Sequence, residues 1–546
     1  MNVNTCGMKT SFNSLYKALS QIANQFDEAA NASKYTLLNS LTKQALANHK
    51  ALIQYNDLLI FLCAHPNNAT LLGLAEAELK RISKFLKNKN TGDAETYTGS
   101  GLPHSTILTR FSHDLLIWLL EDKNYRVILD SYLEEEEHLN AILKLSLPVL
   151  ERERTSAGLN NKDLLEALYI HEKEQLPFLL EQFSRFNGSP FLKDDLFDRL
   201  ELYTLVQGKD HGFSRAFNRL KNQTTYFHQD LIKKFDSQAL LNTALPPAKA
   251  LDAAATNDLS RIIKTSLVLM SRETDPATYM DLGSLRLFEL ERGISLAIYG
   301  MVPERQLPLE SYVGYTLFKN GFPAAYGGCW VFGQKALFGI NIFEAFRGGE
   351  SGYVMCQILR VYRQVFGINY FEVEPYQFGK DNPDGIASGA YWFYHRYGFR
   401  SIDKEVHRLS EKEFEKIKNK KGYRSSKQTL EALAESYIGL KLGTHQKLSV
   451  NDISENFSAL VKNKFKNKRL DAEAACIARF KSQVNLPEHL SAAETLAMTE
   501  MALIAGALNI QDKAAYDLLG EMVFAKVKDV YYYQQLLSEF LSLIKA

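Results

Sequence analysis

A glycine-rich turn in the central part of the chain carries the clearest chemical signal of the sequence. It reads Arg-Gly-Gly-Glu-Ser-Gly over residues 347–352, between a predicted strand over residues 336–346 and a predicted helix. A helix N-terminus presents unpaired N–H groups and the positive end of the helix dipole, and glycines let a phosphate approach them. The pattern therefore predicts either a phosphate site or a plain tight turn. The helix is indicated by apolar residues spaced by three and four, namely Val354, Ile358, Val361 and Val365.

A tyrosine in an aromatic helix is the second candidate. Residues 382–399 are predicted to form one helix that ends in Tyr-Gly-Phe. Tyr394 lies about 100° around this helix from Phe393, so its hydroxyl is free to face a cleft and donate a proton. The alternative is that Tyr394 only fills the core, and His395 is expected at the surface. The core side of the helix is predicted to be the apolar stripe Ile386, Ala390, Phe393 and Tyr397.

Two glutamates on predicted strands are the candidates for a general base. Glu344 lies on the strand before the turn, and Glu374 ends the next strand, over residues 370–374. A carboxylate in such a position can deprotonate an ammonium group before the amine attacks an acyl carbon. The alternative for both is an exposed or ion-paired carboxylate without a chemical role.

These candidates lie in the part of the chain that is predicted to contain a sheet. Residues 301–400 hold 14 of the 31 glycines, and tight turns need glycine. Two β-prone runs around Asn320-Gly321 predict a hairpin. The order strand, turn, helix, strand from residue 336 to 374 predicts a βαβ unit with a parallel strand pair. Residues 400–406 are predicted to close the sheet.

The turn, helix and strand, followed by a helix that ends in Tyr-Gly-Phe, resemble the GNAT superfamily of acyl-CoA-dependent N-acyltransferases. The resemblance covers residues 307–409, about a fifth of the chain. It implies that the strand before the turn splays from its neighbour and pairs through its backbone with the pantetheine arm of acyl-CoA. It also implies that the turn holds the pyrophosphate and that Tyr394 protonates the departing thiolate. The cofactor-binding residues implied in this way are Ile342, Phe343, Glu344, Ala345, Phe346, Arg347, Gly348, Gly349, Ser351 and Gly352.

The sequence departs from the family pattern at two positions. Glu350 stands where the family has a glycine, and a carboxylate repels a bound pyrophosphate unless it turns away, for instance toward the helix dipole. The interval from Asn382 to Tyr394 is about one helical turn longer than in the family. Glu350 motivates a second hypothesis, in which the chain is a non-catalytic GNAT-like binding or scaffold protein whose helical flanks dock a partner.

The flanks of this region are predicted to be helical, because apolar residues recur there at intervals of three and four. We predict an all-helical domain over residues 1–244, a linker over 245–260, a GNAT-like acyltransferase domain over 261–409 and a helical domain over 410–546. The predicted fold class is α+β. A GNAT-like mixed sheet lies in it between a large all-α N-terminal region and an all-α C-terminal region.

Composition narrows the possible function classes. The 546 residues include 64 Lys and Arg and 63 Asp and Glu, and the net charge of +1 argues against a protein that mainly neutralises nucleic-acid phosphates. The basic stretches 416–427 and 462–469 are predicted to be solvated helix ends; contact with nucleic acid or with the 3′-phosphate of CoA is the alternative. Five scattered cysteines predict no disulfide framework. We expect neither a secretory signal nor a membrane span, and therefore a cytoplasmic protein.

The expected function is the transfer of an acetyl or other acyl group from acyl-CoA to an amine acceptor, which the sequence does not identify. Acetyl-CoA, or another acyl-CoA, is the expected co-substrate. The sequence has no GxSxG or GKS/GKT motif. A protein partner on the helical flanks stays open. We expect no metal, because ligand spacing is lacking among His65, His104, His113 and His138.

Overall fold

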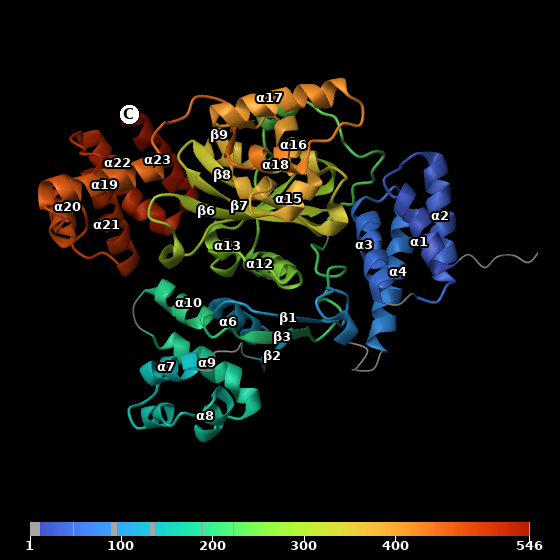
Figure 1. The fold of residues 1–546 in the computed structure, drawn as a ribbon, viewed down its shortest axis with the longest axis horizontal. Coiled ribbons are helices and arrows are strands. Elements are labelled where there is room, and N and C mark those ends of the chain that lie inside the picture. Colours follow the sequence, from blue (N-terminus) through green and yellow to red (C-terminus); the bar gives the residue numbers. More distant parts are fainter. Residues whose placement is uncertain are drawn as a thin grey trace, which may run out of the picture.

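The computed structural model of the chain describes residues 11–46, 49–88, 95–131, 137–186, 189–221 and 223–544. Figure 1 shows a large sheet in the middle, a helical bundle from each end of the chain at its two sides, and a smaller lobe below. The described part is a mixed α+β structure, which confirms the predicted fold class at this level. Its helices include none with the length and hydropathy that a membrane span requires.

Four helices form the N-terminal bundle. Three of them begin at a polar residue that caps the helix: the side chains of Ser11, Asp27 and Asn68 each accept the N–H group three residues further on. The apolar side chains of the bundle belong to the same core as those of the large sheet. The helices are α1 (Phe12–Ile22), α2 (Glu28–Thr42), α3 (His49–Ala64) and α4 (Ala69–Lys87).

The lobe that follows contains a three-stranded sheet, so the prediction of an all-helical region over residues 1–244 is wrong. The middle strand, β3, pairs antiparallel with β1 and β2. The strands are short, and a short apolar run has no period that separates a strand from a buried helix. The elements of the lobe are η1 (Glu95–Tyr97), β1 (Thr106–Thr109), α6 (His113–Glu121), β2 (Tyr125–Ser131), α7 (Glu137–Ser146), η2 (Glu151–Ser156), α8 (Asn161–Ala167), η3 (Glu172–Glu174), α9 (Gln175–Ser184), α10 (Pro190–Asp198) and β3 (Tyr203–Gly208).

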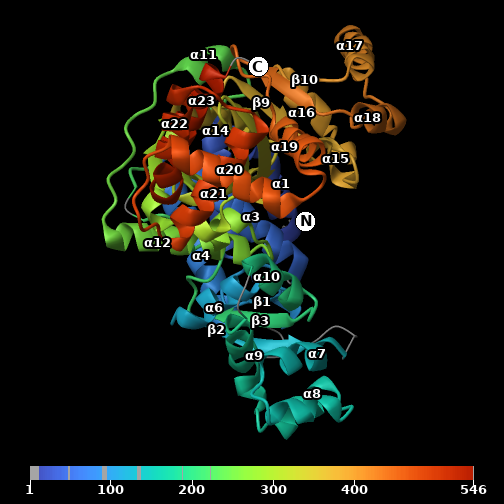
Figure 2. The same cartoon turned by 90° about the vertical axis from the view of Figure 1, so that its left-hand side faces the viewer.

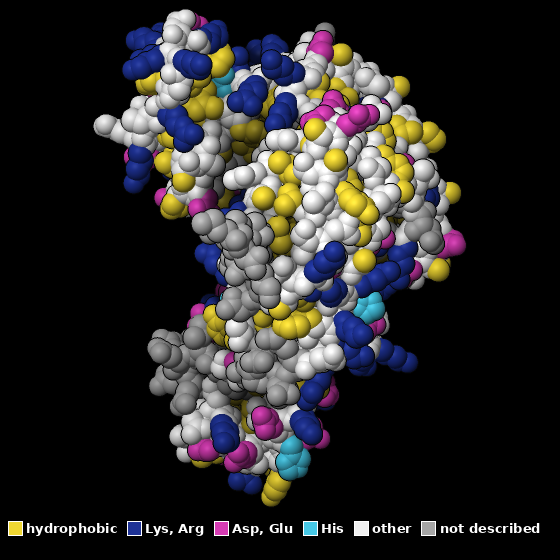
Figure 3. Space-filling model, turned by 90° about the vertical axis from the view of Figure 1, so that its right-hand side faces the viewer, with side chains coloured by type: hydrophobic (Ala, Val, Ile, Leu, Met, Phe, Trp, Pro, Cys, Tyr) yellow, Lys and Arg dark blue, Asp and Glu magenta, His cyan; other side chains and the backbone are white. Residues whose placement is uncertain are grey.

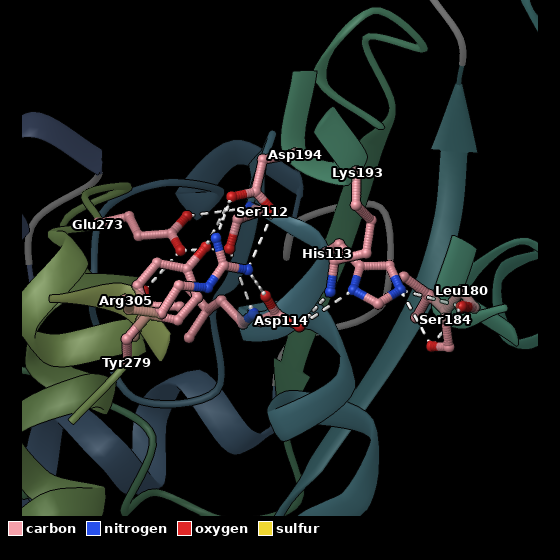
Figure 4. A network of polar contacts seen from close by, with 12 residues as sticks. Ser112, His113, Asp114, Leu180, Ser184, Lys193, Asp194, Glu273, Tyr279 and Arg305 are labelled. Carbon is pink, nitrogen blue, oxygen red and sulfur yellow. Dashed lines mark hydrogen bonds and ion pairs between the residues drawn. The ribbon is translucent and has the colours of Figure 1, made fainter. Parts of the chain in front are cut away.

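A network of ion pairs and hydrogen bonds fastens this lobe to Glu273, which precedes the large sheet, and to Arg305, which lies between two of its strands (Figure 4). The buried guanidinium of Arg305 donates to Asp114 at 2.7 Å and also to Asp194, which lie on two helices of the lobe. The carboxylate of Glu273 accepts hydrogen bonds from the backbone N–H and the hydroxyl of Ser112. The lobe is therefore held by charged contacts as well as by packing.

The large sheet has eight strands in the order β10-β11-β9-β8-β7-β6-β5-β4. Neighbouring strands are antiparallel except β8 and β9, which are parallel and connected through α14 (Ser351–Phe366), so the predicted βαβ unit is confirmed. The predicted hairpin is also confirmed: Asn320 and Gly321 have φ values of 44° and 83° between β6 and β7. The strands are β4 (Arg286–Glu289), β5 (Ile294–Tyr299), β6 (Ser311–Lys319), β7 (Phe322–Phe332), β8 (Lys335–Ile342), β9 (Tyr370–Val373), β10 (Arg400–Ser401) and β11 (Ile438–Lys441).

Three elements near the glycine-rich turn differ from their prediction. Strand β8 ends at Ile342, and the next residues form a 3-10 turn instead of continuing the strand to residue 346. Gly389, at φ 65°, breaks the predicted helix over 382–399 into two, because a left-handed residue does not continue a helix. The predicted strand over 400–406 is only two residues long, since the side chain of Asp403 caps a new helix.

The remaining elements surround the large sheet. Figure 2 shows α17 and α18 projecting from the body beside α15 and α16. The helices are α11 (Ser237–Asn242), α12 (Ala253–Val268), α13 (Asp275–Thr278), α15 (Pro383–Ser388), α16 (Ala390–Arg396), α17 (Lys404–Asn419) and α18 (Lys427–Leu433). The 3-10 turns are η4 (Leu282–Ser284), η5 (Glu291–Gly293), η6 (Pro303–Arg305), η7 (Glu344–Phe346) and η8 (Pro375–Phe378).

The large sheet extends beyond the predicted boundary at residue 409. Strand β11 inserts between β9 and β10, so the region 410–546 is not all helical as predicted. Helix α12 begins at Ala253, inside the predicted linker over 245–260. The C-terminal bundle is tied to the sheet by Gln534, which donates to the hydroxyl of Ser311 and the carbonyl of Val331. Its helices are α19 (Val450–Phe465), α20 (Arg469–Gln483), α21 (Ala492–Ala507), α22 (Lys513–Lys528) and α23 (Val530–Leu543).

Candidate active site

The large sheet opens between its two parallel strands. Strands β8 and β9 pair only from Lys335 opposite Tyr370 to Leu337 opposite Glu372. Beyond that point β9 soon ends, whereas β8 runs on to Ile342 with β7 as its sole strand partner. The edge of β8 that faces β9 therefore has backbone groups without a strand partner, and these groups need other hydrogen bonds.

Two side chains meet this free edge. The side-chain oxygen of Gln377 accepts the N–H of Ile340 at 3.4 Å, and Nε of Arg347 donates to the carbonyl of Ile342 at 3.1 Å. These contacts place the backbone groups of Ile340 and Ile342 on the side of the opening. An extended ligand in the opening would find the same donors and acceptors, as a peptide does when it adds to a sheet edge.

A cleft of about 660 Å³ lies at the end of β8. Its walls come from the end of β8, from the glycine-rich turn, and from α15 and α16. The structure therefore brings the turn and the helix that the sequence singles out to one cavity. The predicted site residues that line it are Ile342, Arg347, Gly348, Gly349, Ser351, Gly352 and Tyr394.

The turn leads directly into the N-terminus of α14. Gly348 has a φ of 77°, which favours glycine, and the N–H of Val354 makes an early helical hydrogen bond to the carbonyl of Glu350 at 2.9 Å. The N–H groups of residues 351–353 have no partner inside the helix. Since Ser351 and Gly352 line the cleft, this end of the helix offers donors and a positive dipole to an anion there.

Glu350 is turned away from the cleft. Its buried carboxylate accepts from Nζ of Lys319 at 2.6 Å, from Arg292 at 2.9 Å and from the backbone N–H of Ile232 at 3.0 Å. Burial by itself raises the pKa of Glu350, but hydrogen bonding from His65 and the charge of Lys319 hold it well below its usual range. The departure from the family glycine thus places no negative charge in the cleft.

Gly352 is required by the closeness of a tyrosine. A Cβ atom on this residue would lie 1.7 Å from the hydroxyl oxygen of Tyr397, which also lines the cleft. The ring of Tyr397 is held in place by stacking on Phe235, with 5.7 Å between the ring centroids. The first turn of α14 and Tyr397 therefore fit together only when residue 352 has no side chain.

We expect Gly352→Ala to lower the free energy of unfolding by about 1–3 kcal/mol, the usual cost of inserting atoms into a packed site. Gly349→Ala is the matched control, because its Cβ would lie 3.7 Å from Leu231, an ordinary contact distance. Denaturant titration of the two variants measures the difference. Equal stability of both would contradict the tight fit of Gly352 against Tyr397.

Tyr394 lies between the cleft and the core. Its side chain is buried, its ring packs edge-on against Phe378 and Phe399, and its hydroxyl makes no hydrogen bond to the residues that the structure describes. Burial, followed by the nearby charge of Glu374, raises the pKa of Tyr394 above its usual value, so the hydroxyl keeps its proton. A protonated phenol at the cavity wall is the state that a proton donor must have before reaction.

The buried side of α16 differs from the apolar stripe that the sequence predicts for this helix. The break at Gly389 changes the orientation of the following turn, and the buried residues of α16 are Tyr391, Tyr394 and His395. Phe393 and Tyr397, which are predicted to face the core, are partly buried: they pack against the core and also line the cleft. His395 is not at the surface as expected, since it is 2% exposed.

The other predicted residues of the strand before the turn are not in the cleft. Glu344 is exposed and belongs to η7, and Phe343, Ala345 and Phe346 line a separate small cavity beside Asp57. The chain turns away after Ile342, so that these residues do not continue the free edge of β8. The implied pairing of their backbone with a pantetheine arm, and the role of Glu344 as a base, are therefore not supported by the geometry.

Several cleft residues carry no signal in the sequence. Lys233 and Arg396 are exposed at the cleft and form no ion pair with the described residues, and Gln377 reaches into the opening from the segment after β9. Lys233 comes from a segment more than a hundred residues before the turn, in the predicted helical region. Only the fold brings it to the glycine-rich turn, so that local spacing cannot reveal it.

A larger groove adjoins the cleft. It has a volume of about 1300 Å³, lies between α15–α16 and α17–α18, and shares Asn382, Phe393 and Arg396 with the cleft. Arg424 and Lys427, from the basic stretch over 416–427, line its outer side. In Figure 3 the projection at the upper left, which contains α17 and α18, carries many Lys and Arg side chains. The end of the basic stretch over 416–427 is therefore exposed, as predicted, and also lines the groove that adjoins the cleft.

The arrangement combines a free strand edge, helix N–H donors, a protonated phenol and three cations around one cavity, and these cations, Lys233, Arg347 and Arg396, form no ion pair with a described residue. It can hold an extended ligand with a phosphorylated end and donate a proton near the strand edge. Comparison of the chain with protein-family models, with curated proteins and with solved structures finds no match.

Proposed function

We propose that the protein is a GNAT-like N-acyltransferase that moves an acetyl or other acyl group from acyl-CoA to an amine. The observation that carries the proposal is the opening between β8 and β9, which ends at the glycine-rich N-terminus of α14. The family resemblance implies a splayed strand followed by a phosphate-binding turn. The opening runs along β8 up to Ile342 and leads to the glycine-rich turn, which supports the proposal, whereas residues 343–346, for which the resemblance implies the same role, lie outside it.

In this proposal the chain binds acyl-CoA as an added strand with a charged end. The backbone of Ile340 and Ile342 would pair with the amides of the pantetheine arm. For this the side chain of Gln377 must give up its hydrogen bond from the N–H of Ile340. The pyrophosphate would lie on the N–H groups of the first turn of α14, with Lys233 and Arg396 beside it. Holding thioester and amine together in this way supplies most of the rate enhancement.

The two proton transfers would use the aromatic helix and the end of β9. Tyr394 would donate its proton to the departing thiolate, and Glu374, whose charge acts on Tyr394, would accept the proton of the attacking ammonium. Glu374 replaces Glu344 in the proposal because its charge acts on Tyr394, which lines the cleft, whereas Glu344 is exposed in η7; neither glutamate itself lines the cleft. The carbonyl of the thioester would be polarised by an N–H of the β8 edge.

The scaffold hypothesis depends on Glu350 as a sign of a lost cofactor site. Because this carboxylate is neutralised by Lys319 and Arg292 on the far side of the turn, it gives no reason to expect weak binding of acyl-CoA. That the acceptor is an amine, and that the helical flanks bind a protein partner, stay predictions.

Titration calorimetry with acetyl-CoA tests the proposal. We expect one molecule bound per chain, and substitution of both Lys233 and Arg396 by Gln to weaken binding about tenfold or more, since one charge-assisted contact contributes about 1.5–3 kcal/mol. Lys234→Gln is the control, because Lys234 is exposed but does not line the cleft. No binding up to millimolar acetyl-CoA, or equal affinity of all variants, would overturn it.

A further inference from the structure

Three side chains that can bind a metal converge behind the glycine-rich turn. His65 follows α3, His228 lies in the segment between the small lobe and α11, and Glu350 precedes α14. All three are buried, with exposed fractions of 4%, 1% and 3%. One ligand atom of each lies within 4.8 Å of the other two, and Nε2 of His65 is 3.7 Å from a carboxylate oxygen of Glu350.

His228 is an unexplained polar group in this cluster. Both of its ring nitrogens are buried and neither has a hydrogen-bond partner among the described residues. Its ring lies 5.0 Å from that of His65, between centroids, and one of its nitrogens lies within 4.8 Å of a ligand atom of His65 and of Glu350. Buried polar groups in native proteins nearly always have a partner, so an imidazole without one indicates a missing ligand.

We propose that His65, His228 and Glu350 form a binding site for a divalent transition-metal ion of the zinc class. Two imidazole nitrogens and one carboxylate oxygen suit such an ion, which leaves a fourth position for water. Ligands bound at about 2.0–2.2 Å to a tetrahedral ion lie about 3.4 Å apart. The separation of 3.7 Å between His65 and Glu350 is close to this value, and the limit of 4.8 Å for the other pairs means that His228 must shift by at most about 1.4 Å.

Lys319 competes with the ion for Glu350. Its ammonium nitrogen lies 2.6 Å from the carboxylate oxygen that also faces His65, whereas Arg292 binds the other oxygen. An ion that binds this oxygen must displace the ammonium, since two positive charges cannot share it at close range. The cluster thus has two alternative states, one with the ion pair between Lys319 and Glu350 and one with the metal.

The position of the site gives the ion a structural role. It would join the end of α3, the segment before α11 and the residue that precedes α14, and it would thereby fix the turn on the side opposite the cleft. The inference does not depend on the proposed acyl transfer, because the three ligands face away from the cleft.

The test is a titration of the full chain, freed of metal by a chelator, with Zn²⁺ and with Co²⁺. We expect one ion per chain by elemental analysis and a visible Co²⁺ spectrum of a nitrogen and oxygen site. His65→Ala and His228→Ala should each weaken binding at least about tenfold. His489→Ala, at an exposed histidine, should leave it unchanged.

Lys319→Met makes the test specific. Removal of the competing ammonium should tighten Zn²⁺ binding at least about tenfold, whereas an ion bound elsewhere on the chain would not respond. The Lys319→Met titration also tests the metal site if a histidine variant fails to fold. Absence of a stoichiometric ion, or an affinity that neither Lys319→Met nor the histidine variants change, would overturn the proposal.

Discussion

Tyr394→Phe is expected to lower the turnover of acyl-CoA with an amine acceptor by about 10²–10⁴-fold, the usual contribution of a general acid. The affinity for acetyl-CoA and the free energy of unfolding should change little, because the ring keeps its contacts with Phe378 and Phe399. The Tyr394 hydroxyl has no hydrogen bond to a described residue, so its removal leaves no buried group unpaired. Release of free thiol, measured at saturating acetyl-CoA, gives the turnover.

Tyr391→Phe is the matched control for this prediction. Tyr391 is a buried tyrosine of the same helix, but its hydroxyl is bonded to Ser401 and it does not line the cleft. Its substitution should affect stability by about 1 kcal/mol and leave turnover nearly unchanged. Equal effects of both substitutions on turnover would show that the cleft position of Tyr394 has no chemical role.

Glu350→Ala is expected to lower the free energy of unfolding by about 3–5 kcal/mol, because it leaves Lys319 buried without a counter-ion and deprives Arg292 of one. Substitution by glycine, the residue that the GNAT pattern has at this position, should have the same effect and should not improve binding of acyl-CoA. Glu344→Ala, at an exposed glutamate only six residues earlier, is the control and should change stability by less than about 0.5 kcal/mol.

The same carboxylate makes stability depend on pH. The pKa of Glu350 is lowered in the folded state relative to its ordinary value of 4.5. Its contribution is therefore fully present above that value and is lost as the pH falls below it. Denaturant titrations of the wild type and Glu350→Ala should differ most near neutral pH and converge in acid. A difference that is independent of pH would contradict the ion-pair account.

The part of the fold that the sequence predicts is the part governed by local rules. The Asn320-Gly321 turn and the βαβ unit each follow from signals between residues that lie close together in the sequence. The small sheet around β3 is not predicted, because β1 and β3 pair across about a hundred residues of sequence. Strand β11 is not predicted for a related reason, since it enters the sheet after two helices.

The candidate site was predictable to the same extent. The turn residues and Tyr394 carry local signals and meet in one cleft, whereas Glu344 was misplaced because η7 ends the strand at Ile342. Lys233, Gln377 and Arg396 reach the cleft through the fold alone. The same holds for His65 and His228, which lie 163 residues apart in the sequence and in contact in the structure.

The central claim is that the free edge of β8 and the first turn of α14 bind acyl-CoA, and hydrogen exchange measured by mass spectrometry tests it most directly. Acetyl-CoA should slow exchange of the amides of Ile340 and Ile342 and of residues 351–353, because these N–H groups face the opening or the cleft and gain hydrogen bonds to the pantetheine arm and the pyrophosphate. The amides of Gly339 and Asn341 face β7 and should not change. The strand β3 of the small lobe serves as an internal reference that should not change. Unchanged exchange over residues 338–353 at saturating acetyl-CoA would contradict the account.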